Sequence, residues 1–382
     1  MSVAAVVVFA CLHALQPLLP ELSRTFALSE LQTSWAYAIG TLSLGISLLF
    51  YGALSDALGR RSLLIWTLVG MTVCTFALTQ VESYGELLCW RALQGFCLGG
   101  LPAIAIAYLG EELSPPALLS AVASYISASS LGGILGRLLA GFFADLGHWP
   151  WTFWPLFLAC VLLCIGVIRY LPPSQHFEAK PFSWRVALAD HGFHLRQPVL
   201  LITYLIGGLN FFIYVNQYTY MSFVLAAPPF GLGSGLIGLL FLTYLTGTLG
   251  SALSGRIGQA IAVPVAMALG VLIMMLGSLV TLWQSIPLIV AGFFITAFGF
   301  FLTHSLASSW VNRHARKAKA SASALYLVFY YVGASTGSLY LQPFWQWQQW
   351  SGVIVGSCLM LSVTLLLCLR LRRFDVGLRS GQ

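Results

Sequence analysis

The chain has 382 residues, of which 59% are hydrophobic and 8% are charged, and its net charge is +7. A soluble protein carries about 25% charged residues, so this chain cannot cover itself with polar surface and needs lipid as its solvent. The composition excludes a soluble globular protein. It predicts an all-α membrane protein, because the short alternating runs of outer-membrane barrels do not occur.

Twelve long apolar runs predict twelve transmembrane helices. They are expected over 3–23, 33–54, 62–80, 86–108, 117–143, 151–170, 198–220, 233–254, 261–282, 286–307, 320–341 and 351–369. The polar stretch 171–197, with Pro172, Pro173 and Pro181, separates six spans from six. We therefore expect an N-terminal six-helix bundle over 1–170, a cytoplasmic linker loop over 171–197, and a C-terminal six-helix bundle over 198–382 that ends in a short cytoplasmic tail.

The basic residues predict the orientation of these spans. Most of them lie in loops that share one side if both termini share it: Arg60, Arg61, Lys180, Arg185, Arg196, Arg256, Arg313, Arg316, Lys317, Lys319, Arg370, Arg372, Arg373 and Arg379. The opposite loops carry only Arg24. The positive-inside rule then places both termini in the cytoplasm and the multi-pass chain in the cytoplasmic (inner) membrane. The positive charge is thus a topology signal and implies no nucleic acid. One loop departs from it, the acidic "LGEELSPP" at 109–116.

Two sequence patterns recur at nearly the same distance along the chain. "ALSDALG" (53–59) returns as "ALSGRIG" (252–258), an offset of 199, and "YISASSLGGILG" (125–136) returns as "YLVFYYVGASTG" (326–337), an offset of 201. The two offsets predict two pseudo-symmetric six-helix halves in the same orientation.

The stretch "GALSDALGRR" after the second span, together with the two halves, resembles the major facilitator superfamily, whose signature there is G-x-L-a-D-r-x-G-r-R. The chain has Ala57 where the family often has a base. The resemblance implies twelve helices and transport by alternating access. It also implies a conformational latch between the halves, which we call the latch; its residues are Gly52, Asp56, Gly59, Arg60 and Arg61.

Simple chemistry agrees with a latch at this place. Gly52 is expected to let helices approach closely, and Gly59 to permit a sharp turn. Asp56 can accept hydrogen bonds from the loop arginines. The alternative is a plain topology anchor, in which the arginines hold the loop inside.

Two arginines lie inside spans, where a charge costs about 2.5–3.5 kcal/mol. Arg91, in "LLCWRALQGFCLGG", resembles the family's second motif, L-x-x-x-R-x-x-Q-G, through Leu87, Gln94 and Gly95. The resemblance implies a role in proton coupling or in the cavity. The alternative is that Arg91 extends to the outer interface.

Arg137, in "GGILGRLLAGFFAD", lies within a pattern that resembles the third motif, G-x-x-x-G-P-x-x-G-G, of proton-exchanging exporters. Gly132, Gly136 and Gly141 match it and are expected to pack spans 5 and 8 closely, while Arg137 replaces the proline. That replacement weakens the antiporter inference. Arg137 either faces the cavity or pairs with Asp145.

No Asp or Glu lies deep inside a span, which argues against cationic drugs as substrates. The candidates for proton coupling beside the arginines are Glu21, Asp145, His13 and His304, because histidine titrates near neutral pH. The resemblance implies a cavity lined mainly by spans 1, 4, 7 and 10 with parts of 2, 5, 8 and 11, and the polar residues on these spans predicted to contact substrate are Gln16, Asn210, Tyr214, Gln217 and Tyr330. These side chains favour a neutral or anionic small molecule. The alternative is hydrogen bonding between helices.

We expect a secondary transporter that exports a small organic solute in exchange for protons and works as a monomer in the lipid bilayer. Proton-driven uptake of an anionic metabolite is the alternative. A polytopic enzyme or a receptor scaffold would need a cluster of catalytic groups or a long soluble domain, and the sequence shows neither. The eight cysteines form no C-x-x-C pattern and no G-x-x-x-x-G-K-[ST] loop occurs, so we expect no catalytic residue, no cofactor, no metal and no nucleotide-driven pump.

Overall fold

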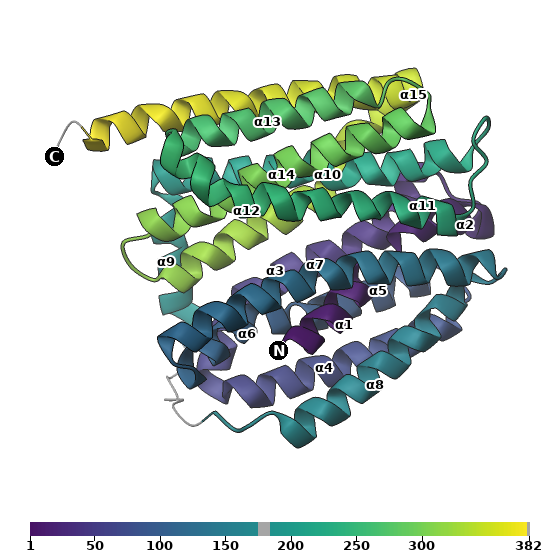
Figure 1. Cartoon of the computed structure of the whole chain (residues 1–382). Helices are drawn as coiled ribbons and strands as arrows, with labels where there is room; N and C mark the ends of the chain where they lie inside the picture. Colours follow the sequence, from purple (N-terminus) through teal and green to yellow (C-terminus); the bar gives the residue numbers. More distant parts are fainter. Residues whose placement is uncertain (175–183, 380–382) are drawn as a thin grey trace. The chain divides into compact units, whose positions relative to one another are not determined.

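The structure is a computed structural model that describes residues 1–174 and 184–379, and in this part of the chain every regular element is a helix (Figure 1). The first half comprises α1 (Ser2–His13), η1 (Gln16–Leu18), α2 (Leu19–Phe26), α3 (Glu30–Leu58), α4 (Arg60–Ala77), η2 (Leu78–Gln80), α5 (Tyr84–Leu98), α6 (Gly100–Glu112), α7 (Pro115–Asp145), η3 (Trp149–Thr152) and α8 (Phe153–Tyr170). The rest comprises α9 (Trp184–Leu195), α10 (Pro198–Ala226), α11 (Ser234–Leu239), η4 (Leu240–Thr243), α12 (Tyr244–Ala260), α13 (Val263–Val280), α14 (Ile286–His314) and α15 (Lys319–Arg379).

The predicted all-α membrane fold is confirmed. Eleven helical stretches of the described chain are long and apolar enough to cross a membrane. The last of them covers Lys319–Phe374, which is 56 residues and would be about 84 Å long as one straight helix, far more than a bilayer core of about 30 Å. It breaks at Gln348 and Gln349, whose backbone angles are not helical. This break divides the stretch into the eleventh and twelfth predicted spans.

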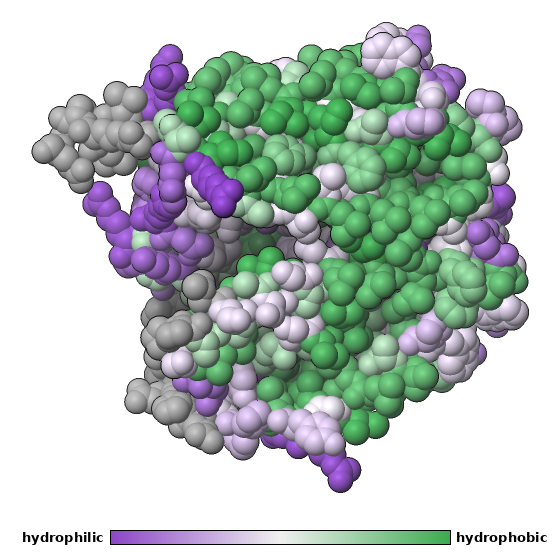
Figure 2. Space-filling model, viewed as in Figure 1, coloured by the Kyte–Doolittle hydropathy of each residue, from purple (hydrophilic) through white to green (hydrophobic). Residues whose placement is uncertain are grey.

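The surface of the helices suits a lipid environment. Large apolar side chains are widely exposed, among them Trp66 at 72%, Leu366 at 64% and Leu162 at 60%. On the face in Figure 2, hydrophobic residues cover the middle stretches of the helices, and hydrophilic residues gather toward their ends. Exposed apolar area on this scale is stable only where hydrocarbon replaces water.

The chain forms two compact units. Unit 1 comprises residues 1–184 and 222–241, and unit 2 comprises residues 185–221 and 242–382. Within unit 1, α1 packs against α7, α3 against α5, and α4 against α8, as Figure 1 shows for the last pair. The short α11 also belongs to unit 1 and packs against α7. Within unit 2, α13 packs against α14 and α15, and α12 packs against α14.

The polar stretch 171–197, predicted as a loop, contains a helix, α9. Its last turn is fixed to the turn between α14 and α15. His194 Nε2 lies 3.3 Å from the carbonyl oxygen of Ala318, and the Lys317 ammonium lies 3.9 Å from the ring centre of Phe193. Burial lowers the pKa of His194. Residues 175–183 of the predicted linker, which include Pro181, lie outside the described residues.

Candidate functional site

Arg60 is the centre of a charged cluster at the turn between α3 and α4. Its guanidinium lies 2.5 Å from an Asp56 carboxylate oxygen and 2.9 Å from Glu111 Oε1, and it also donates to the Ser55 hydroxyl. Gly59 makes the turn with φ 94°, a conformation that glycine adopts without steric cost. The turn therefore places one cation between two acids from different helices.

The other two latch residues behave differently. Arg61 donates to the carbonyl oxygens of Leu171 and Ile168, each at 2.8 Å, and so covers the end of α8. A methyl group added at Gly52 would contact nothing within 4 Å. The close helix approach expected at Gly52 is therefore not found in the described structure.

Glu111 was not predicted as a member of this cluster. The only signal for it in the sequence was the acidic loop 109–116, which departs from the positive-inside pattern. In the structure Glu111 accepts two hydrogen bonds from Arg60 at 3.1 and 2.9 Å, so one acid of this loop has a fixed cationic partner.

Arg91 is fully buried within unit 1. It donates to the carbonyl oxygens of Cys11 at 3.2 Å and Leu12 at 3.0 Å, and to the Gln94 side chain. A methyl group at Gly40 would lie 2.8 Å from Arg91 Nη2, so that glycine makes room for the guanidinium. Arg91 thus connects α5 to α1 and does not extend toward an interface. Its role in proton coupling stays a prediction.

Arg137 contacts two other predicted site residues, His13 and Gln16. Its guanidinium donates to Gln16 Oε1 at 2.8 and 3.0 Å and to the Gly133 carbonyl at 3.0 Å. Its Nη2 lies 3.1 Å from His13 Nδ1. The guanidinium also lies 4.4 Å from the ring centre of Phe241, a cation–π distance. The ring of Tyr37, on α3, stacks on His13. We call His13, Gln16, Tyr37 and Arg137 the α1–α7 cluster.

The hydrogen bonds of the α1–α7 cluster fix the proton position on the His13 ring. A guanidinium has only donors, so His13 Nδ1 accepts the bond from Arg137 and carries no proton. The Tyr37 hydroxyl lies 3.0 Å from the same nitrogen. His13 is therefore neutral in this arrangement, with its ring proton on Nε2. A proton added at Nδ1 would place two donors face to face.

The two acids predicted as proton carriers lie in local contacts. Asp145 Oδ2 accepts a hydrogen bond from the backbone N–H of Gly235 at 3.0 Å, near the start of α11. Glu21 lies 3.4 Å from Arg24, one turn further along α2. A carboxylate near a helix start interacts favourably with the positive end of the helix dipole. The positions of both acids can therefore be explained by structure alone.

The three motif glycines of α7 allow close helix contacts, but with different partners. A methyl group at Gly132 would lie 2.7 Å from Val6 Cα, and one at Gly136 would lie 2.6 Å from Ala10 Cα. At Gly141 a methyl group would lie 2.9 Å from Gly235 Cα. The expected packing of spans 5 and 8 thus occurs at Gly141, whereas the other two glycines pack against the first span.

The polar residues predicted on the seventh span are buried inside unit 2. Gln217 exchanges hydrogen bonds with Ser278 of α13, at 2.9 and 3.2 Å. Asn210 Nδ2 donates to the Phe300 carbonyl at 3.2 Å, and its Oδ1 has no hydrogen-bond partner among the described residues. Tyr214 stacks on the Phe300 ring at 3.8 Å and 2°. These contacts connect helices, and the cavity role of the three residues stays a prediction.

His304 and Tyr330 keep part of their surface exposed. His304 Nδ1 lies 2.9 Å from the Tyr326 hydroxyl, and the His304 ring lies 4.7 Å from the Tyr330 ring. Tyr330 stacks on Phe211 at 3.8 Å and 16°. Unit 2 therefore presents a histidine and a tyrosine supported by further rings. No group of three His, Cys, Asp or Glu in the described residues could hold a metal ion.

Comparisons with known proteins place these features in a family. A model of the Major Facilitator Superfamily matches residues 1–338. The chain is 35% identical over 372 residues to the inner membrane transport protein YnfM of Escherichia coli (strain K12), covering 97% of this chain and 89% of that protein. It is 33% identical over 358 residues to the uncharacterized MFS-type transporter YybF of Bacillus subtilis (strain 168), covering 94% and 88%.

Among solved structures, a mutant of the nucleoside transporter NupG is similar in fold, with a TM-score of 0.77 at 13% identity over 97% of this chain and 98% of that one. The chain therefore belongs to the major facilitator superfamily, and it is a multi-pass membrane transporter and not an enzyme.

Proposed function

We propose that this secondary transporter exports a small organic solute across the cytoplasmic membrane in exchange for protons. The observation that carries the proposal is the hydrogen bond from Arg137 to His13 Nδ1 at 3.1 Å. It joins a cation on α7 to a titratable group on α1, an arrangement that suits proton exchange. The α7 glycine pattern, with its resemblance to the exporters' motif, supports the direction of transport.

His13 is the proton carrier in this proposal. Protonation at Nδ1 replaces the accepted hydrogen bond by repulsion between an imidazolium and the guanidinium of Arg137. Arg137 must then move, and its bonds to Gln16 and to the Gly133 carbonyl change with it. Those bonds connect η1 to α7, so protonation of one ring changes the contact between two helices. Proton binding is thereby coupled to a change of helix packing in unit 1.

His304 and Tyr330 are the proposed substrate contacts in unit 2. Both rings are partly exposed, and Tyr330 is backed by Phe211, so they can stack on a planar group. Aromatic pairs of this kind contribute about 0.5–1.5 kcal/mol. Asn210 is fully buried and its Oδ1 has no hydrogen-bond partner among the described residues, so it can accept a bond from a hydroxyl or amide in a state of the cycle that exposes it. A neutral or anionic aromatic solute is preferred to a cation because unit 1 buries Arg91 and Arg137 and no Asp or Glu lies deep inside a span.

The latch completes the transport cycle in this proposal. Asp56 and Glu111 share Arg60, and both acids are partly exposed, so the pairs can break and re-form at small cost. The cytoplasmic position of both termini, the division into bundles 1–170 and 198–382, and action as a monomer belong to the same proposal. The distribution of Lys and Arg supports the orientation.

Proton-driven uptake of an anionic metabolite is the second candidate. The observation that favours it is the burial of two arginines in unit 1, Arg91 and Arg137. A guanidinium binds a carboxylate through two parallel hydrogen bonds, so the α1–α7 cluster suits an anion as well as a proton.

Proteoliposomes with an enclosed pH-sensitive dye test the function. A panel of anionic, neutral and cationic solutes is added to the wild type and to an Asp56→Asn control. The proposal expects protons to move opposite to one neutral or anionic aromatic solute. Protons that move together with an anion would establish uptake, and solute movement without protons would contradict coupling.

A further inference from the structure

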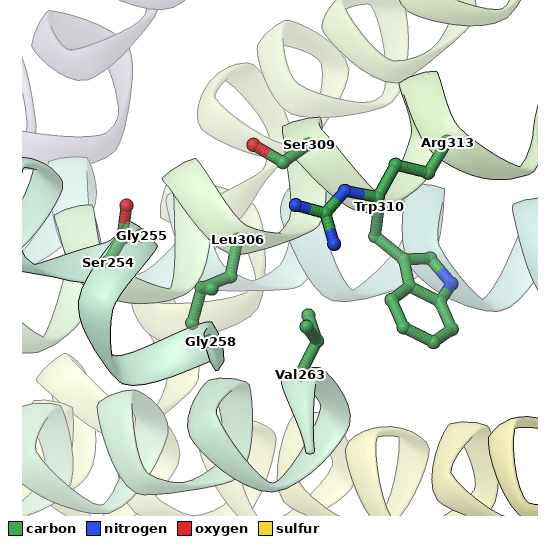
Figure 3. Close-up of a pocket in the computed structure, with 8 residues that line it drawn as sticks. All are labelled: Ser254, Gly255, Gly258, Val263, Leu306, Ser309, Trp310 and Arg313. Carbon is green, nitrogen blue, oxygen red and sulfur yellow. The ribbon is translucent and has the colours of Figure 1, made fainter. Parts of the chain in front are cut away.

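A pocket opens in unit 2 where α12 and α14 end and α13 begins (Figure 3). It therefore lies where three spans reach the boundary between membrane and water. Its lining residues are Ser254, Gly255, Gly258, Val263, Leu306, Ser309, Trp310 and Arg313. All of them belong to unit 2.

The sequence repeat explains why this space is open. The offset of 199 residues aligns Gly255 with Asp56, and it aligns Gly258 with Gly59 and Gln259 with Arg60. In unit 1 this place holds the ion pairs of Arg60, whereas unit 2 has a glycine where the acid would be. A methyl group added at Gly255 would contact nothing within 4 Å. The second half thus keeps the glycine of the motif, here inside α12, but has lost the acid and the base that pair in unit 1.

Arg313 supplies a cation to the vacated space. Figure 3 shows its guanidinium directed into the region between Ser309 and Val263. Within the described residues, Arg313 has no carboxylate partner. The stretches 185–221 and 242–382 contain eleven of the 18 lysines and arginines but only two of the 11 acids, Asp190 and Asp375. The potential around the pocket is therefore positive.

We propose that this pocket binds the phosphate of an anionic phospholipid. Arg313 would donate two parallel hydrogen bonds to phosphate oxygens. The Ser309 hydroxyl, which has no partner among the described residues, can donate a third. The Ser254 hydroxyl already donates to the Ser251 carbonyl at 2.6 Å, so it offers a lone pair to a head-group hydroxyl. Phosphatidylglycerol carries both groups, a charged phosphate and free hydroxyls.

The surroundings favour a lipid over a free phosphate ion. Leu306 and Val263 form apolar walls of the pocket. Further along the same helices, apolar side chains face outward, including Leu249 at 58% on α12 and Leu272 at 48% on α13. Acyl chains can lie along this surface while the phosphate stays at the boundary, so van der Waals contacts add to the polar contacts of the head group. A free phosphate would gain only the polar contacts.

Native mass spectrometry of the full-length protein in detergent tests the site, with phosphatidylglycerol, phosphatidylcholine and inorganic phosphate as probes. Arg313→Gln should weaken phosphatidylglycerol binding by about tenfold or more, which corresponds to about 1.4 kcal/mol. Arg316→Gln removes the same charge from an exposed position in the following turn and should leave binding unchanged.

Gly255→Asp restores the acid of the first half and should weaken binding without loss of the fold, because the position has open space around it. Equal weakening by Arg313→Gln and Arg316→Gln would overturn the site. Equal binding of phosphatidylcholine would overturn the charge selectivity. Displacement of the lipid by inorganic phosphate at similar concentration would overturn the lipid assignment.

Discussion

Arg137 Nη2 lies 3.1 Å from His13 Nδ1, and a guanidinium can only donate, so the histidine must accept. This single bond connects a charge in α7 to a titratable ring in α1. It also makes the neutral state of His13 a condition for the observed arrangement. The predictions for the α1–α7 cluster follow from this relationship.

Arg137→Ala should strongly reduce coupled transport while the protein still folds. The change removes the donor to His13 and leaves Gln16 Oε1 without its two hydrogen bonds from the guanidinium. Hydrogen bonds to charged groups contribute about 1.5–3 kcal/mol, so transport should fall by about tenfold or more. Arg137→Lys keeps the charge but lacks the planar guanidinium with its several donors, so its transport rate should stay close to that of Arg137→Ala. Unchanged affinity and turnover in Arg137→Ala would rule out a transport role.

Asp56→Asn should slow exchange and leave substrate affinity nearly unchanged. The Asp56 side chain is 40% exposed, so its pair with Arg60 should contribute only about 0.2–1 kcal/mol, or up to about a fivefold change in a conformational equilibrium. Substrate exchange rates and equilibrium binding, measured in parallel, separate the two effects.

The matched control for Asp56→Asn is Glu82→Gln, which neutralises an exposed acid between α4 and α5. A latch role requires a larger effect from Asp56→Asn than from this control. Equal exchange rates in both variants would rule out a latch role and leave these residues as a topology anchor.

Gly136→Ala should destabilise unit 1. Its methyl group would lie 2.6 Å from Ala10 Cα, so α1 and α7 would have to separate, and overpacking of this kind costs about 1–3 kcal/mol. Gly166→Ala in α8 is the control, because a methyl group there meets nothing within 4 Å and should stabilise the helix by about 0.5–1 kcal/mol. Thermal unfolding in detergent measures both, and a lower melting temperature for Gly166→Ala than for Gly136→Ala would contradict the packing.

Low pH should release α9 from unit 2. Burial lowers the pKa of His194, so the folded state binds fewer protons than the unfolded state below the ordinary histidine pKa of about 6.5. The docking of α9 is therefore fully stable above that pH and weakens as the pH falls. The buried Nδ1 has no partner among the described residues, so a proton there would be an unpaired donor.

Hydrogen exchange of 184–195 between pH 5 and 8, corrected for the intrinsic pH dependence of exchange, measures this docking. His194→Gln can keep the bond to Ala318 but cannot take up a proton in this range, so its protection should not depend on pH. The same pH dependence in the variant and the wild type would exclude His194 as the cause.

The sequence predicted the fold well because hydropathy over about 20 residues is a strong signal. It predicted which residues carry charge inside the membrane, since a buried arginine is expensive wherever it lies. It did not predict neighbours across helices. The pairing of Arg60 with Glu111 joins residues 51 positions apart, and helical spacing indicates only which face a residue occupies.

The same limit applies to Gln217, whose position on a polar stripe did not reveal that Ser278 of α13 binds it. It also applies to Gly132 and Gly136, whose close contacts are with α1. The helix α9 was missed because its 12 residues lie in a polar stretch with three prolines, which predicts a loop.

The most direct test of the account is the number of protons exchanged per solute in His13→Asn. The asparagine side-chain oxygen can accept the Arg137 hydrogen bond near the Nδ1 position but cannot be protonated at physiological pH. His148→Asn, at an exposed position between α7 and α8, is the control. With the solute identified in the panel above, the account predicts that His13→Asn exchanges solute for solute without moving protons, while His148→Asn keeps the wild-type proton count. A wild-type proton count in His13→Asn would contradict the account.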